Sequence, residues 1–190
     1  MGLVVAPQGF VLNPFGVGER HPFRSPQALL YPGMCLFEGT NASEGRGTDI
    51  PFEMVGAPFV KSNELISALG DFQLAGVQFE PVEFTPTFQK WKGQKCFGVR
   101  LKVTDRADFK PYATGIGMIW AFYSLYNDKG FQWRMEPYEF VEDTPAIDLL
   151  TGSTTVRSAV EKRLPLSEIL EWVGEPSVTF LRQRSPYLLY

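Results

Sequence analysis

Three carboxylates and one arginine fall close together in this sequence. Glu38, Glu44 and Glu53 lie in one short stretch, with Arg46 among them. Glycoside hydrolases cleave sugar bonds with two carboxyl groups, about 5–5.5 Å apart in retaining enzymes and about 6.5–9.5 Å apart in inverting ones. An arginine beside them can hold a carboxylate through two parallel hydrogen bonds. The spacing allows Arg46 to clamp Glu44 or Glu38, or to bind a carboxylate on a ligand.

The stretch from residue 38 to residue 48 has no large apolar side chain, although apolar residues flank it on both sides. We therefore expect a surface loop, where binding residues tend to concentrate. Its glycines allow sharp turns and a close approach to a ligand. Asn41, Ser43 and Thr48 add amide and hydroxyl groups that can hydrogen-bond. The alternative is a loop whose charged groups only satisfy one another.

Other chemistries fit the sequence poorly. The glycines have neither the P-loop spacing nor the G-x-G-x-x-G spacing of nucleotide sites. His21 is the single histidine, so a Ser-His-Asp triad is not favoured. Together with Cys35 and Cys96, it cannot supply a His/Cys zinc site. We expect two buried free thiols, no metal and no organic cofactor, although the spacing does not exclude a disulfide.

Composition and charge narrow the class of protein. A chain of 190 residues with 44% apolar residues suits one globular domain. A net charge of −3 argues against a nucleic-acid partner, which requires a basic face. No apolar run approaches the roughly 20 residues that span a bilayer, so no membrane insertion is expected. The first residues do not resemble a signal peptide. We expect a cytoplasmic chain or a piece of a larger protein.

The order of the expected elements predicts an α+β fold, with a small, mostly antiparallel or mixed sheet packed against several helices. Residues 1–27, rich in proline and glycine, are expected to be an extended lead-in with one short strand at 2–5; residues 28–190 are expected to form a single domain. Strands are predicted at 28–31 and 34–37 around a turn, at 76–84 as an edge or bulged strand, at 96–104 and at 131–135. Helices are predicted at 62–69, 111–126, 146–150, 153–162, 167–173 and 176–184, which makes the last third rich in helix.

The tryptophans offer a possible face for stacking on a sugar. Trp91 lies in a polar segment and is the best candidate for this role. Trp120 and Trp172 lie on the apolar sides of predicted helices, so they are expected in the core.

A long motif identifies a family. Leu36-Phe37-Glu38-Gly39-Thr40-Asn41-x-Ser43-Glu44-Gly45-Arg46-Gly47-Thr48, with Pro51-Phe52-Glu53-x-x-Gly56-Ala57-Pro58 after it, closely resembles the hallmark of bacterial NamZ-type exo-β-N-acetylmuramidases. The resemblance continues through shorter matches and covers roughly residues 28–190.

The resemblance implies a function and a partner. The resemblance implies an enzyme of two domains. The N-terminal domain is Rossmann-like and carries a catalytic glutamate, and the C-terminal domain is auxiliary. The active site lies in the cleft between them, where N-acetylmuramic acid is removed from the non-reducing ends of peptidoglycan fragments. This chain resembles the C-terminal domain. Its implied partners are peptidoglycan fragments or muropeptides and a NamZ-type N-terminal catalytic domain, in a periplasmic or secreted setting.

The resemblance also implies the site residues. Substrate binding is expected from Glu38, Asn41, Ser43, Glu44, Arg46 and Thr48. Glu44 is the candidate for a catalytic role, and Arg46 is the expected partner of the lactyl carboxylate of muramic acid. Two alternatives are a stand-alone, non-catalytic sugar-binding module and a truncated, inactive fragment.

Overall fold

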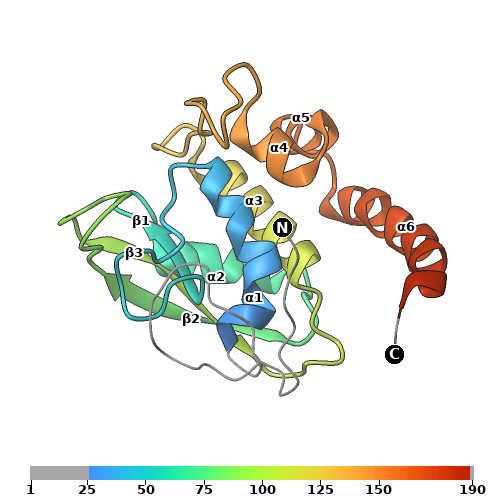
Figure 1. Ribbon diagram of the computed structural model, residues 1–190. Helices are drawn as coiled ribbons and strands as arrows, with labels where there is room; N and C mark the ends of the chain where they lie inside the picture. Colours follow the sequence, from blue (N-terminus) through green and yellow to red (C-terminus); the bar gives the residue numbers. More distant parts are fainter. Residues whose placement is uncertain (1–25, 189–190) are drawn as a thin grey trace, which may run out of the picture.

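A small antiparallel sheet lies on one side of the protein and packs against helices (Figure 1). The computed structural model describes residues 26–188, without the side chains of residues 174–178. Strand β3 (Cys96–Val103) lies between β1 (Met54–Ala57) and β2 (Val77–Phe84), and pairs with both in antiparallel fashion. The predicted α+β fold is therefore confirmed. The expected strand at 2–5 and His21 lie outside the described residues.

Strands β3 and β2 follow from the sequence pattern. In β3, Val99 and Leu101 are buried while Arg100 and Lys102 are exposed, which is the alternation that a half-buried strand requires. Strand β2 is an edge strand, as predicted from Pro81, which cannot donate a ladder hydrogen bond. Its register with β3 is continuous, so it has no bulge. Strand β1 was not predicted, because its four residues are all buried and show no alternation.

Helix α3 (Pro111–Tyr126) matches its prediction at both ends and forms the middle of the core (Figure 1). Ile116, Ile119 and Phe122 are fully buried on it. Helix α3 contacts α1 (Pro26–Met34), α2 (Ser62–Gly70), α5 (Thr154–Glu161), α6 (Leu166–Arg184) and the 3₁₀ turn η1 (Cys35–Gly39). This long, apolar helix is therefore the element on which the others are assembled.

The strand–turn–strand prediction for residues 28–37 is wrong. These residues form helix α1 (Pro26–Met34) and η1 (Cys35–Gly39). Pro26 suits a first helical position, and short apolar runs do not distinguish a strand from a buried helix. Packing decides the outcome, because α1 crosses α3 where Gly33 faces Gly115. A Cβ on Gly115 would come within 2.4 Å of the Gly33 carbonyl oxygen.

Helix α2 (Ser62–Gly70) lies against β2 and β3. Its N-cap is Lys61, so the helix begins at the predicted residue. It ends at Gly70, one residue beyond the predicted end. The predicted strand at 131–135 is also wrong, since Trp133 forms only an isolated bridge with Thr40.

The last third is helical, as predicted. Helices α4 (Ala146–Thr151) and α5 (Thr154–Glu161) follow each other closely, and the Ser153 hydroxyl caps α5 by accepting from the Thr155 N–H. Two separate helices were predicted at 167–173 and 176–184, but α6 (Leu166–Arg184) is continuous and leads into η2 (Ser185–Tyr187). A proline removes one helical hydrogen bond without always ending the helix.

Helix α6 extends away from the other helices and the sheet (Figure 1). Phe180 and Leu181 on it are 60% and 51% exposed. No helix within residues 26–188 is both long enough and apolar enough to cross a membrane.

The contact between α1 and α3 gives a first prediction. Gly115→Ala should lower the free energy of unfolding by about 2–3 kcal/mol, because the new methyl group forces two backbones apart. Urea unfolding followed by tryptophan fluorescence measures this. Gly70→Ala is the matched control, since a Cβ there meets nothing within 4 Å. That variant should gain up to about 1 kcal/mol. Equal effects of the two substitutions would contradict the argument.

Candidate functional site

The polar stretch at residues 38–48, here called the motif segment, lies inside the fold. Thr40, Ser43 and Glu44 are at most 2% exposed, so the expectation of a surface loop is wrong. Ser43 pairs with Gly56 of β1 through two backbone hydrogen bonds of 2.8 and 3.0 Å. On the other side, Thr40 bridges to Trp133. The motif segment is therefore held between the sheet and the chain that follows α3.

Asn41 fastens the motif segment to the chain that follows α3. Its side-chain Nδ2 donates to the carbonyl oxygen of Gly130 at 2.7 Å, and its Oδ1 accepts from the backbone N–H of Gln132 at 3.0 Å. The carbonyl oxygen of Asn41 accepts a third bond, from the indole Nε1 of Trp91 at 2.6 Å. One asparagine thus connects three parts of the chain.

The charged groups of the motif segment form one network. Arg46 pairs with both carboxylates, through Nη2 to Glu38 Oε1 at 2.7 Å and through Nε to Glu44 Oε1 at 3.1 Å. The second oxygen of Glu44 receives Lys90 Nζ at 2.8 Å. Each oxygen of this buried carboxylate therefore faces a cation. Arg46 also lies over the Phe52 ring, 4.8 Å from its centroid.

Lys90 is held on several sides. Besides Glu44, its Nζ donates to the carbonyl oxygens of Phe37 and Ala42, at 2.9 and 3.1 Å. Burial lowers the pKa of this ammonium group, and the charge of Glu44 opposes that change. Lys90 thus stabilises both the backbone of the motif segment and the negative charge of Glu44.

Tyr138 completes the network on the side of Glu38. Its hydroxyl donates to Glu38 Oε2 at 2.8 Å. Desolvation raises the pKa of Tyr138 well above its ordinary value, and the hydrogen bond to Glu38 adds to the effect.

A cavity of about 750 Å³ opens beside this network. Four of the six predicted binding residues line it, namely Glu38, Asn41, Glu44 and Arg46. Its other lining residues are Thr40, Gln89, Lys90, Gln132, Trp133, Arg134, Glu136, Tyr138 and Glu139.

The other predicted residues lie elsewhere. Ser43 and Thr48 are not among the lining residues of this cavity. The Ser43 hydroxyl accepts from the Gly45 N–H at 3.2 Å, and the Thr48 hydroxyl donates to the Gly45 carbonyl oxygen at 2.7 Å. Both therefore hold the turn that presents Arg46. Glu53, the third carboxylate of the stretch, pairs with Arg100 beside a different cavity of about 270 Å³.

Several lining residues were not predicted, because they come from two segments far from the motif. Gln89 and Lys90 follow β2, and residues 132–139 follow α3. In the first segment, the sequence indicated only Trp91 as a candidate for binding a sugar. Trp91 does not line the cavity and packs edge-on against Phe59. Nothing in the local sequence indicates the second segment.

The positions of the other tryptophans agree with the prediction only in part. Trp120 packs against the core, and its Nε1 donates to the Leu164 carbonyl oxygen, as a core position requires. Trp172 was expected in the core but is 40% exposed, so that prediction is wrong. Trp133, one of the four tryptophans considered for stacking on a sugar but not the favoured one, lines the 750 Å³ cavity.

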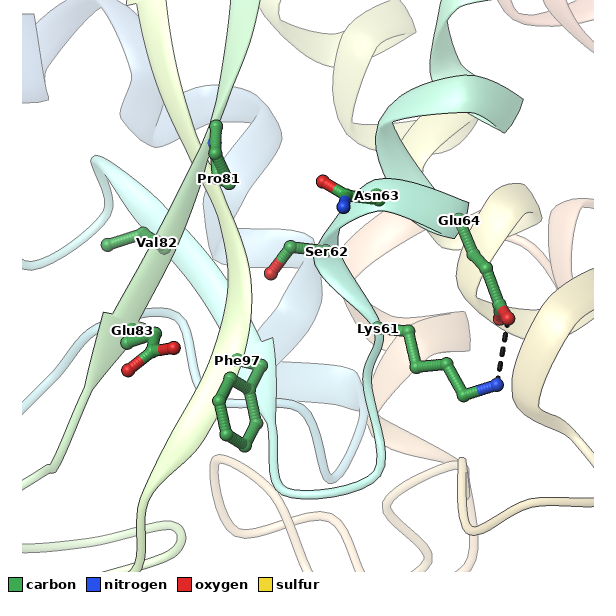
Figure 2. A pocket seen from close by; sticks show the side chains of 8 residues that line it. All are labelled: Lys61, Ser62, Asn63, Glu64, Pro81, Val82, Glu83 and Phe97. Atoms are coloured by element: carbon green, nitrogen blue, oxygen red, sulfur yellow. Dashed lines mark hydrogen bonds and ion pairs between the residues drawn. The ribbon is translucent and has the colours of Figure 1, made fainter.

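A further cavity, of about 630 Å³, lies between the first turn of α2 and the strands β2 and β3 (Figure 2). Lys61 and Glu64 at its edge form an ion pair of 2.8 Å. None of the predicted site residues lines it.

Both cysteines are free thiols, as expected, but only Cys96 is buried, and Cys35 is half-buried. Burial raises the pKa of Cys96 to about 11. Within the described residues, no group of three His, Cys, Asp or Glu side chains is arranged to hold a metal ion.

Comparison with known families decides the relationship. The family described as "Exo-beta-N-acetylmuramidase NamZ, C-terminal" matches residues 29–190. The chain belongs to this family. It is 40% identical over 162 residues to the peptidoglycan beta-N-acetylmuramidase NamZ of Bacillus subtilis (strain 168), a match that covers 85% of this chain and 37% of that protein. The chain thus spans little more than a third of this relative.

Solved structures support the fold. A DUF1343 family protein from Bacteroides fragilis NCTC 9343 superposes with a TM-score of 0.72 at 23% identity, over 86% of this chain and 42% of that one. A second DUF1343 family protein from the same organism gives a TM-score of 0.60 at 27% identity, over 86% and 40%.

The buried pair of Lys90 and Glu44 gives a second prediction. Lys90→Met should lower the free energy of unfolding by about 2–4 kcal/mol, because two carbonyl oxygens and a buried carboxylate lose a donor. Glu44→Gln should also lower the free energy of unfolding, but by about 1–3 kcal/mol less in the Lys90→Met background than in the wild type. Urea unfolding of the two single variants and the double variant measures this.

The control for this prediction is Lys95→Met. Lys95 pairs with Glu83 at 2.6 Å, but both side chains are more than half exposed. Its loss should cost less than about 1 kcal/mol. Purely additive effects of Lys90→Met and Glu44→Gln would show that the pair is not coupled.

Tyr138 gives a prediction about pH. Because its pKa is raised in the folded protein, the stability that it contributes is complete below the ordinary tyrosine pKa of about 10 and is lost as the pH rises above that value. Tyr138→Phe should therefore be less stable at neutral pH and lose stability less steeply above about pH 10. Urea unfolding at a series of alkaline pH values tests this, and parallel curves for variant and wild type would refute it.

Proposed function

We propose that this chain supplies one wall of the site at which an exo-β-N-acetylmuramidase releases N-acetylmuramic acid from the non-reducing ends of peptidoglycan fragments. The observation that carries the proposal is the convergence of Glu38, Asn41, Glu44 and Arg46 on one cavity. Membership of the NamZ C-terminal family supports it, as does the peptidoglycan beta-N-acetylmuramidase activity of the Bacillus subtilis relative.

The cavity has the size and lining that a sugar requires. Its volume of about 750 Å³ lies within the ordinary range for small-molecule sites. Amide groups of Asn41, Gln89 and Gln132 line it, and each can both donate to and accept from sugar hydroxyls or an acetamido group. The indole of Trp133 adds an apolar surface. In this proposal, Ser43 and Thr48 contribute by holding the turn beside Arg46.

Glu44 remains the candidate for a direct part in hydrolysis. The transition state of glycoside hydrolysis resembles an oxocarbenium ion, and a fixed carboxylate stabilises that positive charge. Since both oxygens of Glu44 already face cations, it is poorly placed to donate a proton to the leaving group. We propose that the proton comes from outside this chain, from the N-terminal catalytic domain that the resemblance implies.

Exposed apolar side chains support a partner beside the cavity. Phe88, Met135 and Phe140 are 52%, 65% and 101% exposed, and each is adjacent in sequence to a lining residue. Exposed apolar groups that cluster mark interfaces. We propose that the N-terminal domain packs against them and closes the cavity.

Reconstitution tests the proposed function. The chain, mixed with or fused to the N-terminal domain of a NamZ-type enzyme, should hydrolyse a chromogenic N-acetylmuramic acid glycoside. Glu44→Gln should lower kcat by about 100-fold or more, as the loss of a preorganised charge does elsewhere. Glu64→Gln, a carboxylate beside the cavity of Figure 2, is the matched control and should leave kcat unchanged. Thermal unfolding shows whether each variant is folded.

Other outcomes separate the alternatives. Saturable binding of N-acetylmuramic acid by the chain, without hydrolysis in the reconstituted protein, would favour a stand-alone binding module. If Glu44→Gln and Arg46→Ala both fold and leave kcat and KM unchanged, the motif segment has only a structural role and the proposal fails.

A further inference from the structure

Three cations line the 750 Å³ cavity, and their partners differ. Arg46 and Lys90 are paired with the carboxylates of the motif segment. Arg134 forms no ion pair with any carboxylate of residues 26–188. Its Nη2 donates to the carbonyl oxygen of Pro137 at 3.0 Å, and its guanidinium lies 5.1 Å from the centroid of the Tyr138 ring.

We propose that Arg134 recognises a carboxylate on the ligand, namely the lactyl carboxylate that distinguishes N-acetylmuramic acid from N-acetylglucosamine. This inference rests on the proposed function, since it assigns the substrate preference of the same cavity. Arg46 was the residue expected in this role. Its Nε and Nη2 already contact Glu44 and Glu38, so the geometry favours Arg134.

The backbone and the aromatic ring hold Arg134 in place. Its N–H donates to the carbonyl oxygen of Gly39 at 2.9 Å, and its own carbonyl oxygen accepts from the N–H of Ala146. The Tyr138 ring beneath the guanidinium is itself fixed by the bond from its hydroxyl to Glu38. A guanidinium has five N–H donors in a rigid plane, which suits a bidentate bond to a carboxylate. Little side-chain entropy is lost when such a preorganised group binds.

The charges of the cavity also suit an anion. The buried and half-buried lining residues include three cations but only two carboxylates, Glu38 and Glu44. Glu136 and Glu139 also line the cavity and oppose an anion, but both are exposed, and salt screens exposed charges effectively.

A comparison of two sugars tests the inference. Titration calorimetry of the chain with N-acetylmuramic acid and with N-acetylglucosamine should show a preference of about 10-fold or more for the muramic sugar, as charge-assisted bonds provide. Arg134→Gln should remove this preference and leave the affinity for N-acetylglucosamine unchanged. Arg134→Lys, which keeps the charge and loses the planar fork, should retain part of it. Arg182→Gln, an exposed arginine at the end of α6, is the control for net charge.

Each outcome decides a separate question. If the wild type binds both sugars equally, the inference fails and the proposed function stands. If neither the chain alone nor the chain combined with a NamZ-type N-terminal domain binds either sugar, the proposed function fails, and the inference fails with it. A preference that survives in Arg134→Gln would assign the carboxylate to another cation. If Arg134→Gln does not fold, Arg134→Lys decides: a preference reduced by about threefold or more supports the inference, and an unchanged preference overturns it.

Discussion

Moving a charged group out of water costs several kcal/mol unless opposite charges and hydrogen bonds replace the solvent. The motif segment meets this constraint at Glu44, which is 2% exposed and lies between Arg46 and Lys90. The same lysine holds two backbone carbonyl groups, so satisfying one buried carboxylate also fixes the path of the chain. The cavity, the turn that presents Arg46 and the attachment to the segment after α3 all depend on this arrangement.

The sequence predicted the fold best where a periodic pattern was long. Helix α3 and strand β3 each carry a regular apolar pattern, and both were placed correctly. Helix α1 was mistaken for strands because its apolar run is too short for a period to show, and its contact with Gly115 is a tertiary effect. Strand β1 was missed because burial on both faces removes alternation.

The site was predicted only as far as one continuous motif reaches. Four of the six predicted binding residues do line the cavity. The polar composition of the segment was wrongly equated with exposure, although polar groups are readily buried when they are hydrogen-bonded. Lys90, Arg134 and Tyr138 come from distant segments, and no local spacing connects them with the motif. Only the folded chain brings these residues together.

The bonds that build the cavity join residues very far apart in the sequence. Asn41 reaches across 89 and 91 positions to Gly130 and Gln132, and Tyr138 reaches across 100 positions to Glu38. Closing such long loops is entropically costly, and contacts of this kind tend to form late in folding. During synthesis, the motif segment leaves the ribosome long before its partners exist. The bonds of Asn41 to Gly130 and Gln132, and that of Tyr138 to Glu38, must therefore wait until the chain beyond α3 arrives, and the cavity is among the last features of this fold to be assembled.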